Sequence, residues 1–306
     1  MADRGAPHTL GTQALLWALL LTGGCVGCDP EQALLLVSAG AHHSCAIGPS
    51  QAITCWGDEG IDDSLAAPQG SFLALAAGAK HSCALDLEHA IHCWGSDDKG
   101  QSTPPVSSYD DVFAGARFTC GLASDGRASC WGEDRDGVLD PPSEPLVRGS
   151  AGETHACAIR QSDASLVCWG SNRYGESSPP AGRFLDVAVG AFHGCGLRED
   201  RILVCWGANF HDQATPPTGR YVQVVAGHSH GCARDEQGQV ACWGWSQYDQ
   251  SRDPGETFTQ LAAGSNHNCG WTDDRRVLCW GAGEIYGFCD DTRWECGQAL
   301  PPDEVP

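Results

Sequence analysis

Histidine and cysteine recur along this chain at spacings that could carry chemistry. A histidine stands two residues before a cysteine at His43, His81, His155, His193, His230 and His267. Imidazole and thiolate groups this close are typical zinc ligands, and they also form the nucleophile-and-base pairs of some enzymes. If the same cysteines are oxidised in pairs, they are disulfides and their role is structural.

Fourteen of the eighteen cysteines fall into seven pairs, and each pair ends in the tripeptide Cys-Trp-Gly. Successive tripeptides are 37 or 38 residues apart, and the two cysteines of a pair are 10 residues apart, or 11 in the fourth pair. Such a constant period is the signature of a repeat protein. The pairs are Cys45–Cys55, Cys83–Cys93, Cys120–Cys130, Cys157–Cys168, Cys195–Cys205, Cys232–Cys242 and Cys269–Cys279.

Three observations favour disulfides over zinc. The third repeat has Phe118 in place of the histidine, whereas seven zinc sites would need ligands without exception. Eighteen cysteines are too many for a reducing cytosol without metal, and a thiolate site makes little sense in an exported protein. If Cys120 pairs with Cys130, the hairpin closes on Ser124-Asp125-Gly126, a turn with glycine at its left-handed position. We therefore predict seven disulfides within repeats, histidines hydrogen-bonded between repeats, and no metal or other cofactor.

The elements that would position these residues are short strands. Each repeat contains three apolar segments separated by glycine-containing breaks, as in 109–115, 118–122 and 127–132. None is long enough for a helix, and several alternate with a period of two. The sequence predicts an all-β fold with three strands in each repeat.

The repeat resembles a known family. The pattern Val/Ala-Ala-Gly-x-x-His-x-Cys-Ala-Leu, followed by Cys-Trp-Gly-x-x-x-x-Gly-Gln, is similar to the regulator of chromosome condensation repeat family, with good matches at Ala77-Gly78, Trp94-Gly95 and Gly100-Gln101. The resemblance covers nearly all of residues 33–302 and implies a seven-bladed β-propeller with three- or four-stranded blades. The Gly-Gln element is altered to Gly175-Glu176, Asp212-Gln213 and Asp249-Gln250.

The compact repeat is also similar to that of the bacterial β-lactamase inhibitor protein II, whose propeller binds a protein partner. Nuclear guanine-nucleotide exchange, an activity of the eukaryotic family, should not apply to an exported acidic chain. We expect one propeller domain over residues 29–306, with the ring closed by the N-terminal strand at 34–40. An insertion at about 285–297 brings its own predicted disulfide, Cys289–Cys296.

Residues 1–28 have the features of an export signal. An apolar stretch, Ala14 to Leu21, has signal-peptide length and is too short to span a bilayer. Small residues then lead to Cys25 and Cys28, an order that resembles a bacterial lipobox. Lipid on Cys28 would leave sixteen cysteines, an even number; lipid on Cys25 and a plain cleaved signal are the alternatives. We expect a cell-envelope lipoprotein or a secreted protein.

The charge balance limits the partners. Asp and Glu outnumber Lys and Arg by 39 to 18, a net charge of −21. This charge repels nucleic acid and anionic membranes and favours a basic protein partner, with membrane attachment only through the lipid. Acidic clusters such as Asp97-Asp98 and Glu133-Asp134 fit no calcium loop, so we interpret them as a solvated surface. We expect a monomer.

Function is predicted from the loops. The residues after Ala-Gly and those after Trp-Gly should emerge on one face, and they vary most between repeats. Aromatic residues predicted there as partner-binding are Tyr174, Phe192, Phe210, Trp245, Tyr248 and Tyr286, with Phe288 beside them. No catalytic motif stands out. We expect a non-enzymatic binding propeller; a lyase or hydrolase with its site at the central mouth and a structural envelope protein are the alternatives.

Overall fold

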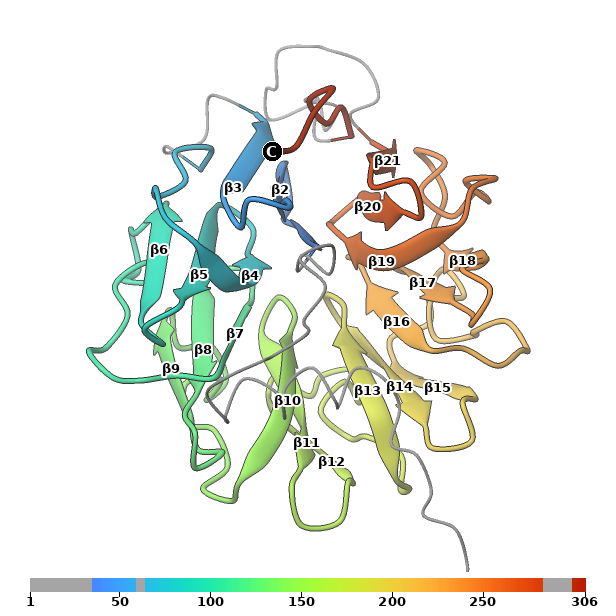
Figure 1. The fold of residues 1–306 in the computed structure, drawn as a ribbon. Helices are drawn as coiled ribbons and strands as arrows, with labels where there is room; N and C mark the ends of the chain where they lie inside the picture. The colour runs from blue at the N-terminus through green and yellow to red at the C-terminus, as the bar shows by residue number, and fades with distance from the viewer. Residues whose placement is uncertain (1–34, 59–63, 283–298) are drawn as a thin grey trace, which may run out of the picture. The chain divides into compact units, whose positions relative to one another are not determined.

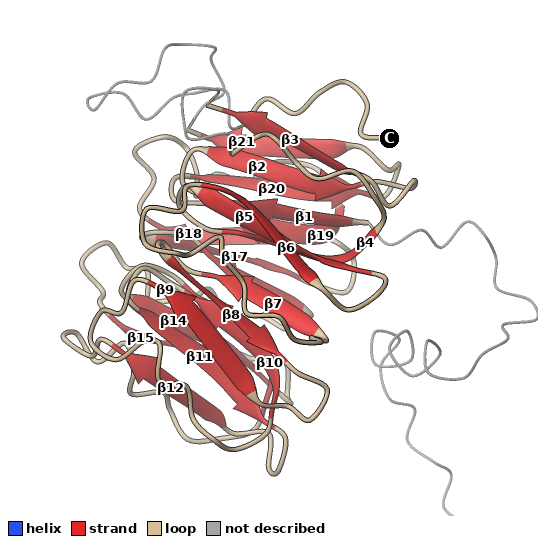
Figure 2. Cartoon of the chain, turned by 90° about the vertical axis from the view of Figure 1, so that its left-hand side faces the viewer, coloured by secondary structure: helices blue, strands red, loops and turns tan. Residues whose placement is uncertain are grey.

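The fold is built entirely from short strands. The computed structural model describes residues 35–58, 64–282 and 299–306, which belong to one compact unit, Leu34–Pro306. The strands are β1 (Leu36–Ala39), β2 (His43–Ile47), β3 (Ile53–Gly57), β4 (Phe72–Ala77), β5 (His81–Asp86), β6 (Ile91–Gly95), β7 (Asp111–Ala114), β8 (Phe118–Leu122), β9 (Ala128–Gly132), β10 (Leu146–Ala151), β11 (His155–Arg160), β12 (Leu166–Gly170), β13 (Phe184–Val189), β14 (His193–Arg198), β15 (Leu203–Gly207), β16 (Gln223–Ala226), β17 (His230–Arg234), β18 (Val240–Gly244), β19 (Phe258–Ala263), β20 (His267–Thr272) and β21 (Val277–Gly281). Among these described residues no helix occurs that could cross a membrane (Figure 2).

The strands form seven antiparallel sheets of three strands, one sheet for each repeat. Each sheet takes its strands in chain order, so every connection inside a sheet is a hairpin. The sheets follow one another around a common axis, and the first strand of each sheet, such as β4, β10 or β16, lies nearest to it (Figure 1). This is the all-β propeller architecture that the repeat pattern predicted, with three-stranded blades.

Each hairpin places the two cysteines of its repeat opposite each other. Cys120 on β8 faces Cys130 on β9, and the same register holds in the other sheets. All seven predicted disulfides in the described residues are present, with Cα atoms 4.0 or 4.1 Å apart. Gly126 in the connecting turn has a φ of 79°, a left-handed conformation that costs little only for glycine. Cys289 and Cys296 lie outside the described residues.

The hydrophobic core lies between neighbouring sheets. The tryptophan of every Cys-Trp-Gly is buried, with at most 8% of its surface exposed. In five repeats the indole N–H donates to a carbonyl of the preceding repeat: Trp94 donates to the Ser64 carbonyl and Trp131 to the Gln101 carbonyl, both at 2.9 Å, and Trp169, Trp206 and Trp243 do likewise. These tryptophans therefore join neighbouring sheets.

The histidines of the repeat form a second set of contacts between neighbouring sheets. All six histidines of the repeat are fully buried, and four meet a polar side chain of an adjacent repeat. The pairs are His43 Nε2 with Ser82 Oγ at 2.7 Å, His81 Nε2 with Thr119 Oγ1 at 2.8 Å, His230 Nε2 with Asn268 Oδ1 at 2.9 Å, and His267 Nε2 with Ser44 Oγ at 2.7 Å. The predicted hydrogen bond between repeats is thus confirmed at these four positions.

Three repeats depart from this pattern, each for a visible reason. Phe118 replaces the histidine of the third repeat, and it packs in one apolar cluster with Ala156, which replaces the hydroxyl residue of the fourth. The ring nitrogens of His155 and His193 have no hydrogen-bonding partner among the residues that the structure describes. The positions that would supply one are Gly194 and Gly231, where a Cβ would lie 2.4 Å and 2.5 Å from the rings of Trp206 and Trp243. The missing hydrogen bonds there follow from packing.

The first and seventh sheets meet without sharing a strand. The predicted closure by the N-terminal strand is not confirmed, because β1 pairs with β2 in its own sheet and with no other described strand. Side chains and loops connect the two sheets: the Val37 N–H donates to Gln260 Oε1 at 2.9 Å, and the Ser265 N–H donates to the Gly40 carbonyl at 3.0 Å.

Candidate functional site

The loops after Ala-Gly (Val-Gly in the fifth repeat) and those after Trp-Gly lie side by side on one face, here called the loop face. A backbone hydrogen bond ties them together: the Ser96 N–H donates to the Lys80 carbonyl at 2.8 Å, and the Trp245 N–H to the Ser229 carbonyl at 2.9 Å. The equivalent bond is present in all seven repeats. The predicted sharing of one face is therefore confirmed, and the hairpin turns such as Ser124-Asp125-Gly126 lie at the other end of the sheets.

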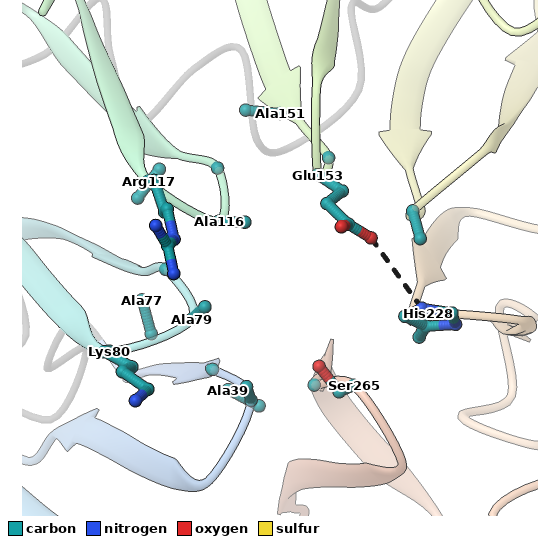
Figure 3. Close-up of a pocket in the computed structure, with 18 of the residues that line it drawn as sticks. Ala39, Ala77, Ala79, Lys80, Ala116, Arg117, Ala151, Glu153, His228 and Ser265 are labelled. Atoms are coloured by element: carbon teal, nitrogen blue, oxygen red, sulfur yellow. Dashed lines mark ion pairs between the residues drawn. The ribbon is translucent and has the colours of Figure 1, made fainter. Parts of the chain in front are cut away.

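A cavity of about 480 Å³ opens at the centre of the loop face. Its wall consists of the Ala-Gly loops of all seven repeats (Figure 3). Backbone hydrogen bonds between successive loops hold this wall, for example from the Ala116 N–H to the Gly152 carbonyl at 3.0 Å and from the His228 N–H to the Ser265 carbonyl at 3.1 Å. The volume lies in the range of ordinary ligand pockets.

Asp98 is one of the charged groups that line the cavity, and four further titratable groups are divided between its two sides. Lys80 and Arg117 lie together on one side, and Glu153 and His228 on the other (Figure 3). Glu153 Oε2 is 3.8 Å from His228 Nε2. Burial lowers the pKa of His228, against the opposing charge of Glu153, so the imidazole is neutral near pH 7.

Aromatic side chains gather on the adjoining part of the loop face. Tyr174 packs edge-on against Phe192 and Phe210, with ring centres 5.7 and 5.3 Å apart, and Phe192 packs edge-on against His228 at 5.9 Å. Tyr174 is 49% exposed and Phe210 is 68% exposed. Three of the predicted partner-binding residues are thus brought into one cluster, which we call the Tyr174 cluster.

A second, smaller cluster lies on the loops of the fifth and sixth repeats. Trp245 stacks on His211 with ring centres 5.7 Å apart, and Tyr248 meets Trp245 edge-on at 6.0 Å. Trp245 and Tyr248 are half-buried. The sequence analysis missed His211 and His228; the signal was their position, since both stand in the variable loops. Tyr286 and Phe288 lie outside the described residues.

The altered Gly-Gln element still organises these loops. Gln213 Oε1 accepts the His211 N–H at 2.7 Å, and Glu176 does the same for Tyr174 at 2.6 Å. Burial alone would raise the pKa of Glu176, but hydrogen bonds from backbone N–H groups outweigh it and lower that pKa. Asp212 has a φ of 61°, which aspartate tolerates better than most residues, so it can stand in for the glycine. The aromatic side chains are consequently carried on ordered loops.

Polar side chains also converge on the axis below the cavity, and the sequence analysis did not single them out. They stand four residues before the glycine of Ala-Gly, at Asp111, Arg148, Asp186, Gln223 and Gln260. Arg148 Nε is 3.0 Å from Asp186 Oδ1, and burial raises the pKa of Asp111 to about 6 although Arg148 opposes the change. Gln223 bonds through both ends of its amide to the backbone of Leu261 in the next sheet, at 3.0 Å. These groups satisfy the free inner edges of the sheets.

No cluster of metal-binding side chains occurs among the residues that the structure describes. The fourteen cysteines seen are all in disulfides, and no group of three or more His, Cys, Asp or Glu side chains is placed to hold an ion. The acidic loops are internally bonded instead: Asp97 accepts the Ser102 N–H at 2.8 Å and the Thr103 hydroxyl at 2.7 Å.

Sequence comparison identifies the repeat. The pattern described as "Regulator of chromosome condensation (RCC1) repeat" matches six segments that together make up more than half of the chain: residues 72–101, 109–138, 147–176, 184–213, 221–250 and 258–287. A search of curated proteins finds no match. The resemblance to β-lactamase inhibitor protein II stays a prediction.

Solved structures with a similar fold include two plant receptor ectodomains. The ectodomain of the receptor kinase CR4 from Physcomitrella patens is 24% identical with a TM-score of 0.70, over 81% of this chain and 72% of that one. The CRINKLY WD40 ectodomain of ACR4 from Arabidopsis thaliana is 26% identical with a TM-score of 0.69, over 81% and 95%. Prp20p from Saccharomyces cerevisiae is 15% identical with a TM-score of 0.66, over 78% and 82%.

Proposed function

The chain belongs to the regulator of chromosome condensation repeat family, and on that premise we propose that it is an exported propeller without enzymatic activity that binds a protein partner through its loop face. The observation that supports this most is the Tyr174 cluster, in which Tyr174 and Phe210 are open to solvent on ordered loops. Large aromatic side chains on a rigid scaffold are typical anchors of protein interfaces.

Seven disulfides, one in each repeat, support an extracellular or exported domain, because such bonds persist only in oxidising compartments. Two of the similar structures are receptor ectodomains. We propose in addition that residues 1–28, outside the described residues, are an export signal and that Cys28, or alternatively Cys25, carries lipid. Mass spectrometry of the protein from its source organism should find a lipid-modified cysteine at its N-terminus; an intact Met1 would contradict export.

The proposal of a non-enzymatic role is supported by how the axial polar groups are used. Gln223 and Gln260 bond the backbone of the following sheet, and Asp186 binds Arg148 and the Val187 N–H. An active site needs groups free to bind substrate, whereas these are occupied by the fold. Nuclear nucleotide exchange is not carried over from the family.

The proposal is tested by comparing three forms of the purified protein as bait in an extract of the source organism. The wild type should retain a partner that the Tyr174→Ser/Phe210→Ser variant loses. Leu87→Ser/Ile202→Ser is the matched control, because these side chains are 54% and 46% exposed on the hairpin turns at the opposite end of the sheets. A partner lost only by the control would assign binding to the other face and overturn the proposal.

A further inference from the structure

Glu153 occupies an unusual place in the central cavity. It follows Gly152 in the fourth repeat, where the first, second, third and fifth repeats have alanine. Its side chain enters the cavity from one side and is 36% exposed (Figure 3). A charged side chain replaces a methyl group at the one level where all seven loops converge.

The charge of Glu153 is uncompensated in the part of the chain that the structure describes. Among the described residues its ion-pair neighbour within 4 Å is His228, which is neutral near pH 7. Arg117 and Arg135 line a small adjoining pocket together with Glu153, but both are paired with Glu133. The other carboxylate lining the cavity, Asp98, accepts Gln101 Nε2 at 3.0 Å and lies 3.7 Å from Lys99 Nζ. Glu153 is therefore available to an outside cation.

The surroundings of Glu153 favour the binding of a cation on that side of the cavity. His228 lines the cavity beside Glu153, and the Phe192 ring outside the lining packs edge-on against His228. A cation bound to Glu153 would lie next to the imidazole, and cations bind well against aromatic faces. Lys80 and Arg117 on the opposite side repel a cation from that half of the cavity (Figure 3). The net charge of −21 attracts a basic partner from a distance.

From this arrangement we infer that the protein partner inserts a lysine or arginine side chain into the central cavity, where its charged head binds Glu153 beside His228. The cavity of about 480 Å³ holds one such side chain with room for water. The inference rests on the proposed function, and it adds the chemistry of the residue that the partner must present.

The test uses a defined probe, a phage-displayed library of random seven-residue peptides closed by a disulfide. The library is selected on the wild-type protein, and clones that no longer bind the Tyr174→Ser/Phe210→Ser variant are kept as loop-face binders. We expect a lysine or arginine at one shared position of these peptides. Synthetic peptides are then measured by calorimetry, each beside a version with norleucine, an uncharged analogue of lysine, at that position.

Two matched variants decide the outcome. Glu153→Gln should weaken the basic peptide at least about tenfold and leave the norleucine peptide unchanged. Glu199→Gln should change neither, because Glu199 lies 2.8 Å from Arg183 Nε on the hairpin turn after β14, at the opposite end of the sheets. Both side chains are partly exposed, so unchanged melting temperatures serve as the folding control.

Failures of the two proposals are distinguishable. Loop-face peptides that carry no shared basic residue, or that bind wild type and Glu153→Gln equally, would overturn the inference and leave the proposed function standing. Peptides that bind the Tyr174→Ser/Phe210→Ser variant as well as the wild type would overturn both.

Discussion

The buried layer and the loop face of the same seven repeats follow opposite rules. In the buried layer every repeat keeps its disulfide and tryptophan, and six keep the histidine. On the loop face the residue two after the glycine changes with almost every repeat: His42, Lys80, Arg117, Thr154, Phe192, Ser229 and Asn266. Buried residues are fixed by the sheet next to them, whereas loop residues are free of that constraint and can be matched to a partner.

Where the buried layer does vary, two sheets vary together. Phe118 faces Ala156 instead of a hydroxyl, so an apolar contact replaces a hydrogen bond. Several contacts between charged side chains on the loop face are looser and partly exposed, such as Arg117 with Glu133 at 3.8 Å and Arg173 with Asp136 at 3.7 Å. Changes in the buried layer should therefore move stability, and changes on the loop face should move binding.

Lowering the pH should cause the largest loss of stability, because it protonates the buried histidines. Burial lowers the pKa of His81, His155 and His230 to about 4, and that of His43, His193 and His267 to about 3, against about 6.5 in the unfolded chain. The unfolded state then binds more protons, so this stability is complete above about pH 6.5 and is lost as the pH falls toward 4.

Each histidine removes up to about 1.4 kcal/mol per pH unit in that window. Asp111 and Asp186 act in the opposite direction because burial raises their pKa, but they are two groups against six. Melting temperatures measured by circular dichroism from pH 7.5 to pH 4 should fall steeply below pH 6.5. A constant melting temperature over this range would contradict the neutral histidine layer.

Removing one disulfide should give the next largest effect. Cys83→Ala/Cys93→Ala opens a closed loop whose ends are 10 residues apart, which destabilises the fold by about 2.5–3 kcal/mol in the chain-entropy model. Denaturant unfolding measures the loss, and partner affinity at low temperature should not change. A loss of partner affinity with unchanged stability would contradict the assignment of stability to the buried layer and of binding to the loop face.

A pair of phenylalanine substitutions sharpens the division inside the buried layer. His43→Phe leaves the fully buried Ser82 hydroxyl without its histidine and should cost about 1–3 kcal/mol. His155→Phe removes a histidine that has no hydrogen-bonding partner among the described residues and introduces the phenylalanine that the third repeat has at this position, Phe118. It should therefore reduce the free energy of unfolding by less than His43→Phe does, or even increase it. Denaturant unfolding of the two variants at pH 7 measures the difference, and equal losses would contradict the assigned hydrogen bond.

Almost all of the fold was predictable from the sequence, because the spacing of residues within a repeat determines how its strands pair. The spacing of Cys120 and Cys130, with Gly126 between them, fixes a hairpin register without any tertiary information. The hydrogen bond that joins the first and seventh sheets was not predictable, since Val37 and Gln260 are 223 residues apart and meet only through a side chain. The expectation that the N-terminal strand closes the ring came from the pattern of residues 34–40 alone.

The sequence predicted which face of the propeller carries the candidate site, but only some of the residues that form it. The alternation of Ala-Gly and Trp-Gly placed Tyr174, Phe192 and Phe210 on one face, and packing then brought their rings together. The division of charge across the cavity depends on how seven loops converge. No local pattern reveals that Glu153 and His228, 75 residues apart, are neighbours.

On the loop face, Trp245→Ala should mainly affect binding. The indole stacks on His211 and is half-buried, so as an interface anchor it should contribute about 2 kcal/mol or more to partner affinity. It lies outside the cores between sheets, so stability should change much less. Affinity by surface plasmon resonance and unfolding by denaturant, both on the same preparation, check this; a stability loss equal to the affinity loss would make Trp245 a structural residue.

The smallest effect should come from the acidic loops of the second and third repeats. Asp97→Asn/Asp134→Asn removes two negative charges and keeps a carbonyl oxygen for the backbone hydrogen bonds that both residues accept. Long-range attraction acts before contact, so association with a basic partner should slow about two- to threefold at low salt, with the dissociation rate unchanged. Because salt screens exposed charges over roughly 10 Å at 0.1 M, the difference should disappear as the salt concentration rises. A changed dissociation rate, persisting at high salt, would mean that these carboxylates contact the partner directly and would extend the binding surface from the aromatic half of the loop face to its charged half.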